Sequence, residues 1–213
     1  MAQITNINQL NLDQTYTYAD YLKWMFTDRV ELLKGRIFKM SPAPNTKHQR
    51  VSAFLSRKIG NYLEKKYCDV FSAPFDVRLS VNQDINISKK YKKKTKLLPD
   101  GNIQTVVQPD ICVICDQSKI DEKGCVGAPD LVIEILSPGN STMEMKDKFS
   151  IYQEAGIPEY WIVDPERESI ILYHLEQNVY KGSHPYCSSD TIMSKAVEGL
   201  SISVDAIFAV TKK

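Results

Sequence analysis

The 213-residue sequence predicts a single α/β domain, in the broad sense that includes α+β folds, in which helices flank a mixed β-sheet. Short apolar runs rich in β-branched residues, at 110–115 and 131–136, predict buried strands. Apolar residues recur at helical spacing within 48–67 and 142–155, which predicts two helices. No repeat and no long linker divides the chain, so residues 1–213 are expected to form one unit.

The first half of the chain reads as a polar arm followed by a helix, a hairpin and a longer helix. Thr17 is a suitable N-cap for the short helix, and Gly35 is a suitable turn residue between two short strands. In order, the expected elements are a polar arm over 1–16, a short helix over 17–26, two strands within 30–44, an amphipathic helix over 48–67 and one or two strands within 69–81.

The second half starts with a lysine-rich insertion over 82–104, which we expect to be an exposed loop. Gly156 and Pro158 are typical of a helix end, so the preceding helix should stop near Ala155. The remaining expected elements are buried strands at 110–115 and 131–136, a helix over 142–155, a hairpin formed by 160–164 and 169–175, and a strand within 199–208.

Charge and cysteine content bear on the binding partners and the cellular compartment of the protein. Lys and Arg number 27 and Asp and Glu 26, so any nucleic-acid binding must come from local clustering of charge. The N-terminus lacks the basic start and apolar core of a signal peptide, and no apolar run approaches the length of a membrane span. We therefore expect a cytoplasmic protein without membrane association, whose 5 cysteines are reduced.

Glu134 lies in the middle of the apolar run 131–136, where an unpaired charge loses several kcal/mol of hydration. A buried Glu134 must therefore meet a cation, a metal ion or a proton. The alternative is a glutamate that faces solvent on an edge strand.

Lys148 is the lysine of the predicted helix 142–155 that points toward the sheet. At about 100° per residue it falls within the apolar stripe of Phe149 and Tyr152, whereas Lys146 falls on the opposite face. Lys148 can thus supply the cation that Glu134 requires. The alternative is a lysine whose stem packs while its ammonium group reaches solvent.

Asp110 opens the other buried strand, where an aspartate can simply cap a turn. The two strands are close in sequence, so they can pair and bring Asp110, Glu134 and Lys148 to one end of a sheet. Two carboxylates with open positions suit Mg²⁺ or Mn²⁺, and a nearby ammonium group stabilises charge on a phosphoryl oxygen. This set of residues predicts phosphodiester hydrolysis.

The same segments carry a resemblance to a known family. The motifs QPDICVI, GAPDLVIEILSP and KDKFSIYQEAGIPEYWIVDP resemble the Uma-two family of putative restriction endonucleases, which is similar in fold to the PD-(D/E)XK nuclease superfamily. The likeness extends from YADYLKWM to GLSISVDAIF and covers nearly the whole chain apart from the lysine-rich insertion. It implies a restriction-endonuclease-like core, a Mg²⁺- or Mn²⁺-dependent endonuclease and a homodimer.

The superfamily motif carries over to this sequence with one departure. Its PD element matches at Asp110 and its acidic position at Glu134, but Leu136 stands where the lysine is expected. The family resemblance implies that this lysine has moved to Lys148, the residue that the helical face selects. It also implies a metal ion held by Asp110 and Glu134, together with the carbonyl of Ile135.

Three further residues are candidates for the site. Glu31 matches an acidic position of the family and is a catalytic candidate, as an accessory ligand or water orienter, unless it faces solvent in a turn. His48 matches the family's histidine at the start of the long helix, where a histidine can equally cap the helix or fill the core. Asp130 alternates onto the face of Glu134, and it can either join the site or cap its strand.

Two other patterns are weaker signals. Cys112 and Cys115 form a CxxC pattern, but residues three apart on a strand point to opposite faces, so zinc is not expected. The lysine cluster in the insertion can contact a phosphate backbone, although such charge runs are usually solvated loops. Its members are Lys89, Lys90, Lys92, Lys93, Lys94 and Lys96.

Taken together, these residues predict a metal-dependent endonuclease that hydrolyses phosphodiester bonds, most naturally in DNA. A homodimer is also expected because one active site per chain and two strands per duplex favour two-fold symmetry. Two alternatives stay open. One is a nuclease-fold protein that binds nucleic acid without cutting it, and the other is an interaction or structural protein of mobile elements.

Overall fold

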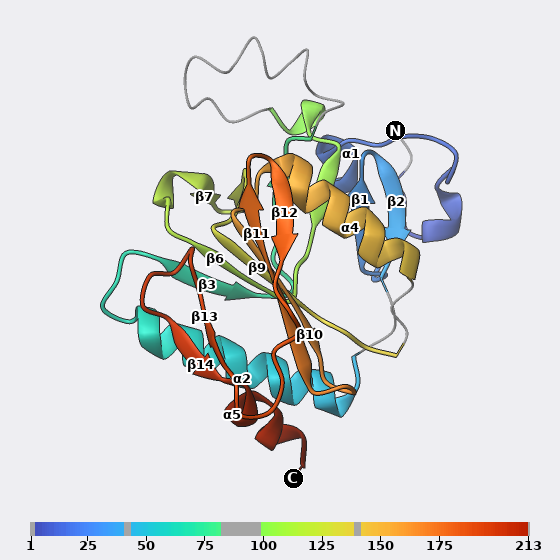
Figure 1. The fold of residues 1–213 in the computed structure, drawn as a ribbon. Helices are drawn as coiled ribbons and strands as arrows, with labels where there is room; N and C mark the ends of the chain where they lie inside the picture. Colours follow the sequence, from blue (N-terminus) through green and yellow to red (C-terminus); the bar gives the residue numbers. More distant parts are fainter. Residues whose placement is uncertain (1–2, 41–43, 82–98, 139–141, 213) are drawn as a thin grey trace.

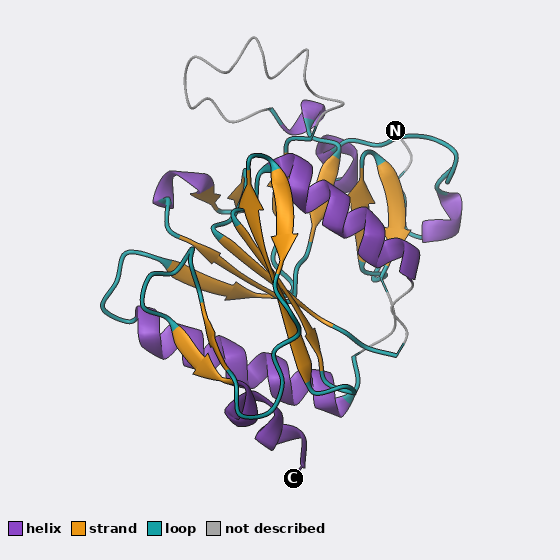
Figure 2. Cartoon of the chain, viewed as in Figure 1, coloured by secondary structure: helices purple, strands orange, loops and turns teal. Residues whose placement is uncertain are grey.

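The computed structural model describes residues 3–40, 44–81, 99–138 and 142–212 (Figure 1). Within these residues, two six-stranded mixed sheets pack with helices, which confirms the expected fold class (Figure 2). The first sheet has the strand order β2 (Arg36–Lys39), β1 (Val30–Leu33), β5 (Thr105–Val107), β4 (Val77–Leu79), β8 (Gly124–Val126) and β7 (Ile120–Asp121). Its β4 and β8 are parallel, and its other neighbours are antiparallel.

The second, central sheet carries the two apolar runs that the sequence singles out. Its strand order is β12 (Val179–Gly182), β11 (Ser169–Glu176), β10 (Glu159–Asp164), β9 (Leu131–Ile135), β6 (Ile111–Ile114) and β3 (Asp69–Ser72). The expected pairing of the two apolar runs is confirmed, because β6 and β9 are antiparallel neighbours. β9 is also parallel to β10, and β10 forms the expected hairpin with β11.

Helices cover both faces of the central sheet (Figure 1). The helices are α1 (Tyr18–Tyr21), α2 (Thr46–Leu63), α4 (Thr142–Ala155) and α5 (Val204–Ala209), with short 3₁₀ turns η1 (Ile7–Gln9), η3 (Asp100–Asn102), η4 (Gln117–Lys119) and η5 (Val210–Lys212). One apolar core lies between α2, α5 and one face of this sheet, and a second lies between its other face, α4 and the first sheet. Alternate residues of β9 therefore face different cores, and Val132 belongs to the α4 side.

Some expected elements differ from those observed. α4 has the bounds that the periodicity predicts, but α1 covers only four residues after its Thr17 N-cap. The strand expected within 199–208 is wrong for its second half, because Val204 begins α5 after the short strand β14 (Ser201–Ser203), which pairs with β13 (Thr191–Met193). Leu200, Ile202 and Val204 alternate as in a strand, and this pattern conceals the helical spacing at which Val204, Ile207 and Phe208 are buried.

The N-terminal arm is more ordered than the expectation of a loose segment. η1 has a capping box between Asn6 and Gln9, and a β-bridge joins Ile4 to Trp24. The lysine cluster at 89–96 lies outside the described residues. None of the helices in the described ranges is long and apolar enough to cross a membrane.

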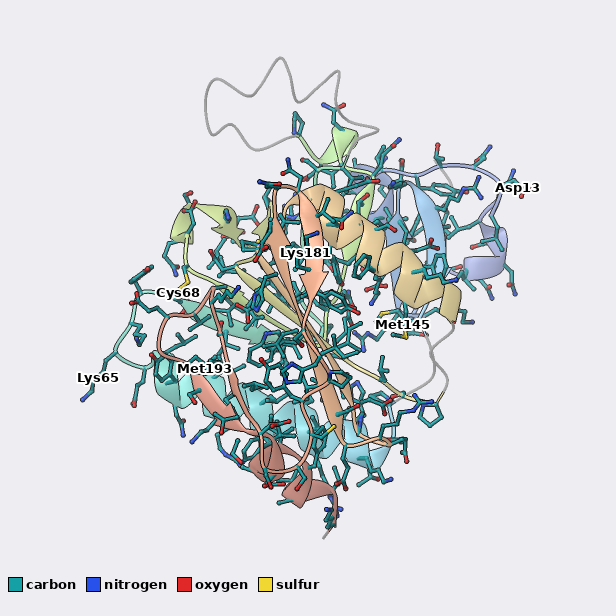
Figure 3. All side chains as sticks on the ribbon, in the orientation of Figure 1. Asp13, Lys65, Cys68, Met145, Lys181 and Met193 are labelled. Atoms are coloured by element: carbon teal, nitrogen blue, oxygen red, sulfur yellow. A yellow bond between two sulfur atoms is a disulfide. The ribbon has the colours of Figure 1, made fainter. Side chains whose placement is uncertain are left out.

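The expectation of reduced cysteines is wrong for one pair. Cys68, which is labelled in Figure 3 and immediately precedes β3, forms a disulfide with Cys115, which immediately follows β6. Asp69 pairs with Ile114 in the antiparallel β3–β6 ladder, so the two cysteines are opposite each other. The 47-residue separation in sequence conceals this proximity. Cys112 and Cys125 are buried free thiols, and Cys187 is an exposed one.

Candidate active site

Lys148 lies on the face of α4 that packs on the central sheet, as the helical periodicity predicts. Its residue surface is only 6% exposed, whereas Lys146 is exposed. The Nζ of Lys148 is 3.0 Å from Oε1 of Glu134 and 3.1 Å from Oε1 of Glu31. The ammonium group is therefore buried between two carboxylates rather than directed to solvent.

Glu134 projects from β9 toward α4 because residues two apart on a strand share a face, and Val132 faces α4. Its Oε1 accepts a hydrogen bond from Lys148 at 3.0 Å and another from the hydroxyl of Tyr152 at 2.6 Å. Lys148 and Tyr152 are four residues apart, so they lie one above the other on the same face of α4. One helix face thus provides both donors that orient this carboxylate.

Glu31 belongs to β1 in the first sheet and is 1% exposed. Besides the contact with Lys148, its Oε1 accepts a hydrogen bond from the backbone N–H of Gln108 at 2.7 Å. The structure thus places Glu31 in the cluster as a buried partner of Lys148, in a strand whose four residues are all buried.

Asp110 lies immediately before β6, at the end of the central sheet where β9 ends. Its Oδ2 accepts a hydrogen bond from the backbone N–H of Ile135 at 2.8 Å and lies 3.1 Å from Nε2 of His48. His48 is buried in the first turn of α2. Neighbours from β9 and α2 thus orient Asp110.

Burial and mutual proximity set the protonation of these groups. Burial raises the pKa of Glu134 to about 7, Lys148 lowers it, and Asp110 and Glu31 raise it further. Burial alone would lower the pKa of Lys148, but the carboxylates of Glu134 and Glu31 raise it above its ordinary value. Burial likewise raises the pKa of Tyr152. Lys148 therefore stays an ammonium ion and Tyr152 stays a phenol.

The predicted candidates separate into those that converge and those that do not. Asp110, Glu134, Lys148, Glu31 and His48 belong to one connected cluster. Asp130 precedes the other end of β9, and its Oδ2 accepts the backbone N–H of Cys115 at 2.7 Å. The structure does not bring Asp130 into the cluster.

Two contributors to the cluster are absent from the sequence-based candidates. Tyr152 could have been found, since it lies on the helix face that selects Lys148. Gln108 had no such signal, because its contact with Glu31 uses the backbone N–H, which every residue except proline possesses. Side-chain type alone cannot reveal a contact of this kind.

A divalent ion would have to be held by few protein ligands. Within the described ranges, no three His, Cys, Asp or Glu side chains form a ligand group for a metal ion. Oδ1 of Asp110 and Oε2 of Glu134, however, accept no hydrogen bond from any residue that the structure describes. Hard carboxylate oxygens of this kind suit Mg²⁺ or Mn²⁺, which keep several water ligands.

Known proteins are similar to this chain in sequence or in fold. An uncharacterized protein, slr1290, from Synechocystis sp. is 25% identical over 192 residues, which cover 89% of this chain and 89% of that protein. The crystal structure of a putative nuclease belonging to DUF820, from Anabaena variabilis, has the same fold, with a TM-score of 0.68 and 18% identity over 92% of this chain and 98% of that chain. The family model described as putative restriction endonuclease matches residues 18–205. The chain therefore belongs to the Uma2 family of putative restriction endonucleases.

Proposed function

We propose that this protein is a metal-dependent endonuclease that hydrolyses phosphodiester bonds in DNA. The observation that carries the proposal is the pair of carboxylates at Asp110 and Glu134, each with one oxygen that accepts no hydrogen bond within the described residues, beside the ammonium group of Lys148. The family description supports endonuclease action, and the resemblance to the PD-(D/E)XK superfamily supports Mg²⁺ or Mn²⁺.

In this proposal, the carboxylates of Asp110 and Glu134 would hold the metal ion, together with the carbonyl of Ile135. Their side chains are 22% and 13% exposed, whereas that of Glu31 is 1% exposed, which favours the first two as ligands. When bound, a divalent ion would supply acidification of a water molecule and would offset negative charge on the phosphate.

The protein residues supply orientation and a fixed positive charge. Two contacts of the Lys148 ammonium group go to Glu31 and Glu134, so one of its three N–H bonds is available for a phosphoryl oxygen or the attacking water. Because its pKa is raised, Lys148 acts as a hydrogen-bond donor and not as a base. Glu31 is the counter-ion that holds Lys148, and His48 and Tyr152 hold the two metal-binding carboxylates.

A nuclease assay over single- and double-stranded DNA and RNA, with Mg²⁺, Mn²⁺ or EDTA, tests this function. We expect cleavage of DNA with either metal ion and none in EDTA. Binding of DNA without cleavage under any condition would favour the non-cutting alternative, and full activity in EDTA would refute the metal-dependent mechanism. The proposal includes a homodimer, because duplex cleavage by one site per chain favours two-fold symmetry.

Metal affinity should weaken as the pH falls below about 7. Glu134 has a raised pKa of about 7, so it is protonated below that value, and a proton competes with the metal ion for the carboxylate. The dissociation constant for Mn²⁺, measured by calorimetry on the protein without DNA, should rise by up to about tenfold per pH unit there. A constant affinity from about pH 8 to pH 5 would show that Glu134 does not bind the ion.

A further inference from the structure

Gln108 occupies the short connection between the two sheets, after β5 and before β6. Its backbone N–H donates to Oε1 of Glu31 at 2.7 Å, and this same oxygen contacts Lys148 at 3.1 Å. Gln108 is 8% exposed, so solvent contributes little to holding it. A displacement of Gln108 would therefore change the position of the counter-ion of Lys148.

The side-chain amide of Gln108 anchors this connection. Its Nε2 donates to Oδ1 of Asp76 at 2.9 Å and to the hydroxyl of Tyr21 at 3.3 Å. Its Oε1 accepts two hydrogen bonds from the guanidinium of Arg29, at 2.8 and 3.3 Å. A glutamine amide has two N–H donors and two acceptor lone pairs, so every one of them is used. The amide can adopt no other orientation without losing a buried hydrogen bond.

Asp76, which accepts a hydrogen bond from the side-chain amide of Gln108, is itself held in place. Asp76 accepts hydrogen bonds from the hydroxyl groups of Tyr18 and Tyr21 on α1, at 3.1 and 3.5 Å. Burial raises the pKa of Tyr21 to about 12 and raises that of Tyr18 still further, so both remain donors. α1 and the first sheet therefore form a fixed support for Gln108.

We propose that Gln108 is a positioning residue that acts on Lys148 through Glu31, an inference that rests on the proposed function. The support from Asp76 and Arg29 fixes the Gln108 backbone, the backbone N–H fixes Glu31, and Glu31 fixes the ammonium group. Small misplacements of a catalytic group reduce rates steeply, so the anchor matters even though Gln108 does not touch the substrate.

Gln108→Leu removes the amide and keeps a side chain of similar volume. We expect the single-turnover cleavage rate at saturating Mg²⁺ and DNA to fall about 10- to 100-fold. Gln117→Leu is the matched control, because Gln117 also donates two hydrogen bonds, to Tyr67 and Asp69, but lies outside the cluster. This control should cleave at the wild-type rate.

A double-mutant cycle separates positioning from a general structural effect. If Gln108 acts through Glu31, Gln108→Leu should cost less than about threefold in a Glu31→Gln background. An equal loss in both backgrounds, or an unchanged rate in folded Gln108→Leu, would overturn the proposal. If the leucine variant does not fold, Asp76→Asn, which neutralises the acceptor of the amide, replaces it in the same cycle.

A measurement that does not require cleavage activity tests this inference separately from the proposed function. A buried, paired ammonium group exchanges slowly with water, so Lys148 should give an ammonium resonance in ¹H–¹⁵N spectra of metal-free protein. Its loss in Lys148→Met assigns it. Gln108→Leu should broaden or abolish the resonance, and Gln117→Leu should not. If wild-type protein cuts no nucleic acid, the proposed function fails, while this resonance still confirms or refutes the positioning role.

Discussion

Lys148→Met is expected to reduce the cleavage rate by about two orders of magnitude or more, and to lower stability as well. The ammonium group lies 3.0 Å from Glu134 and 3.1 Å from Glu31, and its removal leaves both buried carboxylates without a cation. Breaking a buried ion pair by removing one partner costs about 3–5 kcal/mol. Single-turnover rates and thermal unfolding measure the two effects separately.

The matched control for this variant is Lys146→Met. Lys146 is two residues away on the same helix but is exposed, so its replacement should change neither rate nor stability appreciably. Combining Lys148→Met with Glu31→Gln removes one uncompensated charge, which should restore part of the stability but none of the activity. Normal cleavage by Lys148→Met would eliminate the proposed role of this residue.

Asp110→Asn is expected to abolish metal-dependent cleavage while leaving thermal stability nearly unchanged. The asparagine oxygen can still accept the backbone N–H of Ile135, which Asp110 accepts at 2.8 Å. The charge that attracts a divalent ion is lost, however. Affinity for Mn²⁺ should therefore fall by more than the roughly 10- to 100-fold that loss of an outer-shell partner costs.

Asp130→Asn provides the control for Asp110→Asn because the two carboxylates are similarly placed. Each immediately precedes a strand of the central sheet, and Asp130 also accepts a backbone N–H, that of Cys115, at 2.7 Å. It should bind Mn²⁺ and cleave DNA like the wild type. Equal losses in both variants would mean that the effect reflects strand-end structure and not metal binding.

The part of the candidate site on the central sheet and α4 could be predicted from local sequence patterns. The apolar periodicity of 142–155 sets the helix rotation, and this rotation places Lys148 on the buried face and Lys146 on the exposed one. The apolar runs around Asp110 and Glu134 are short and close in sequence, so their pairing could be predicted as well, whereas its antiparallel direction comes from the structure. The helix rotation and the strand pairing both follow from the spacing of apolar residues within short segments.

The parts of the fold and of the site that could not be predicted depend on contacts between segments that are distant in sequence. The strands β4, β5 and β8 have three residues each and are wholly buried, so they show no alternation that marks a face. The burial of Glu31 and the Cys68–Cys115 disulfide likewise arise only from the docking of separate segments. Burial does not itself mark function either.

Glu159 is a buried carboxylate with a structural role. It is as buried as Glu31, yet its oxygens accept hydrogen bonds from Trp161 and from Ser194, Lys195 and Ala196. These contacts satisfy both oxygens and tie the segment before β14 to β10. A buried carboxylate becomes a candidate for chemistry only when a charged partner and an open oxygen accompany it.

The cluster is complete only once α4 has been translated. Glu31, Asp110 and Glu134 are translated before Lys148, which comes from α4. Because α4 supplies both the cation of Glu134 and the helix face that packs over this carboxylate, a chain that ends before α4 lacks both. Incomplete translation products therefore carry the acidic residues without a competent site. Under the proposed function, a nascent chain therefore has no cutting activity before Lys148 has been synthesised.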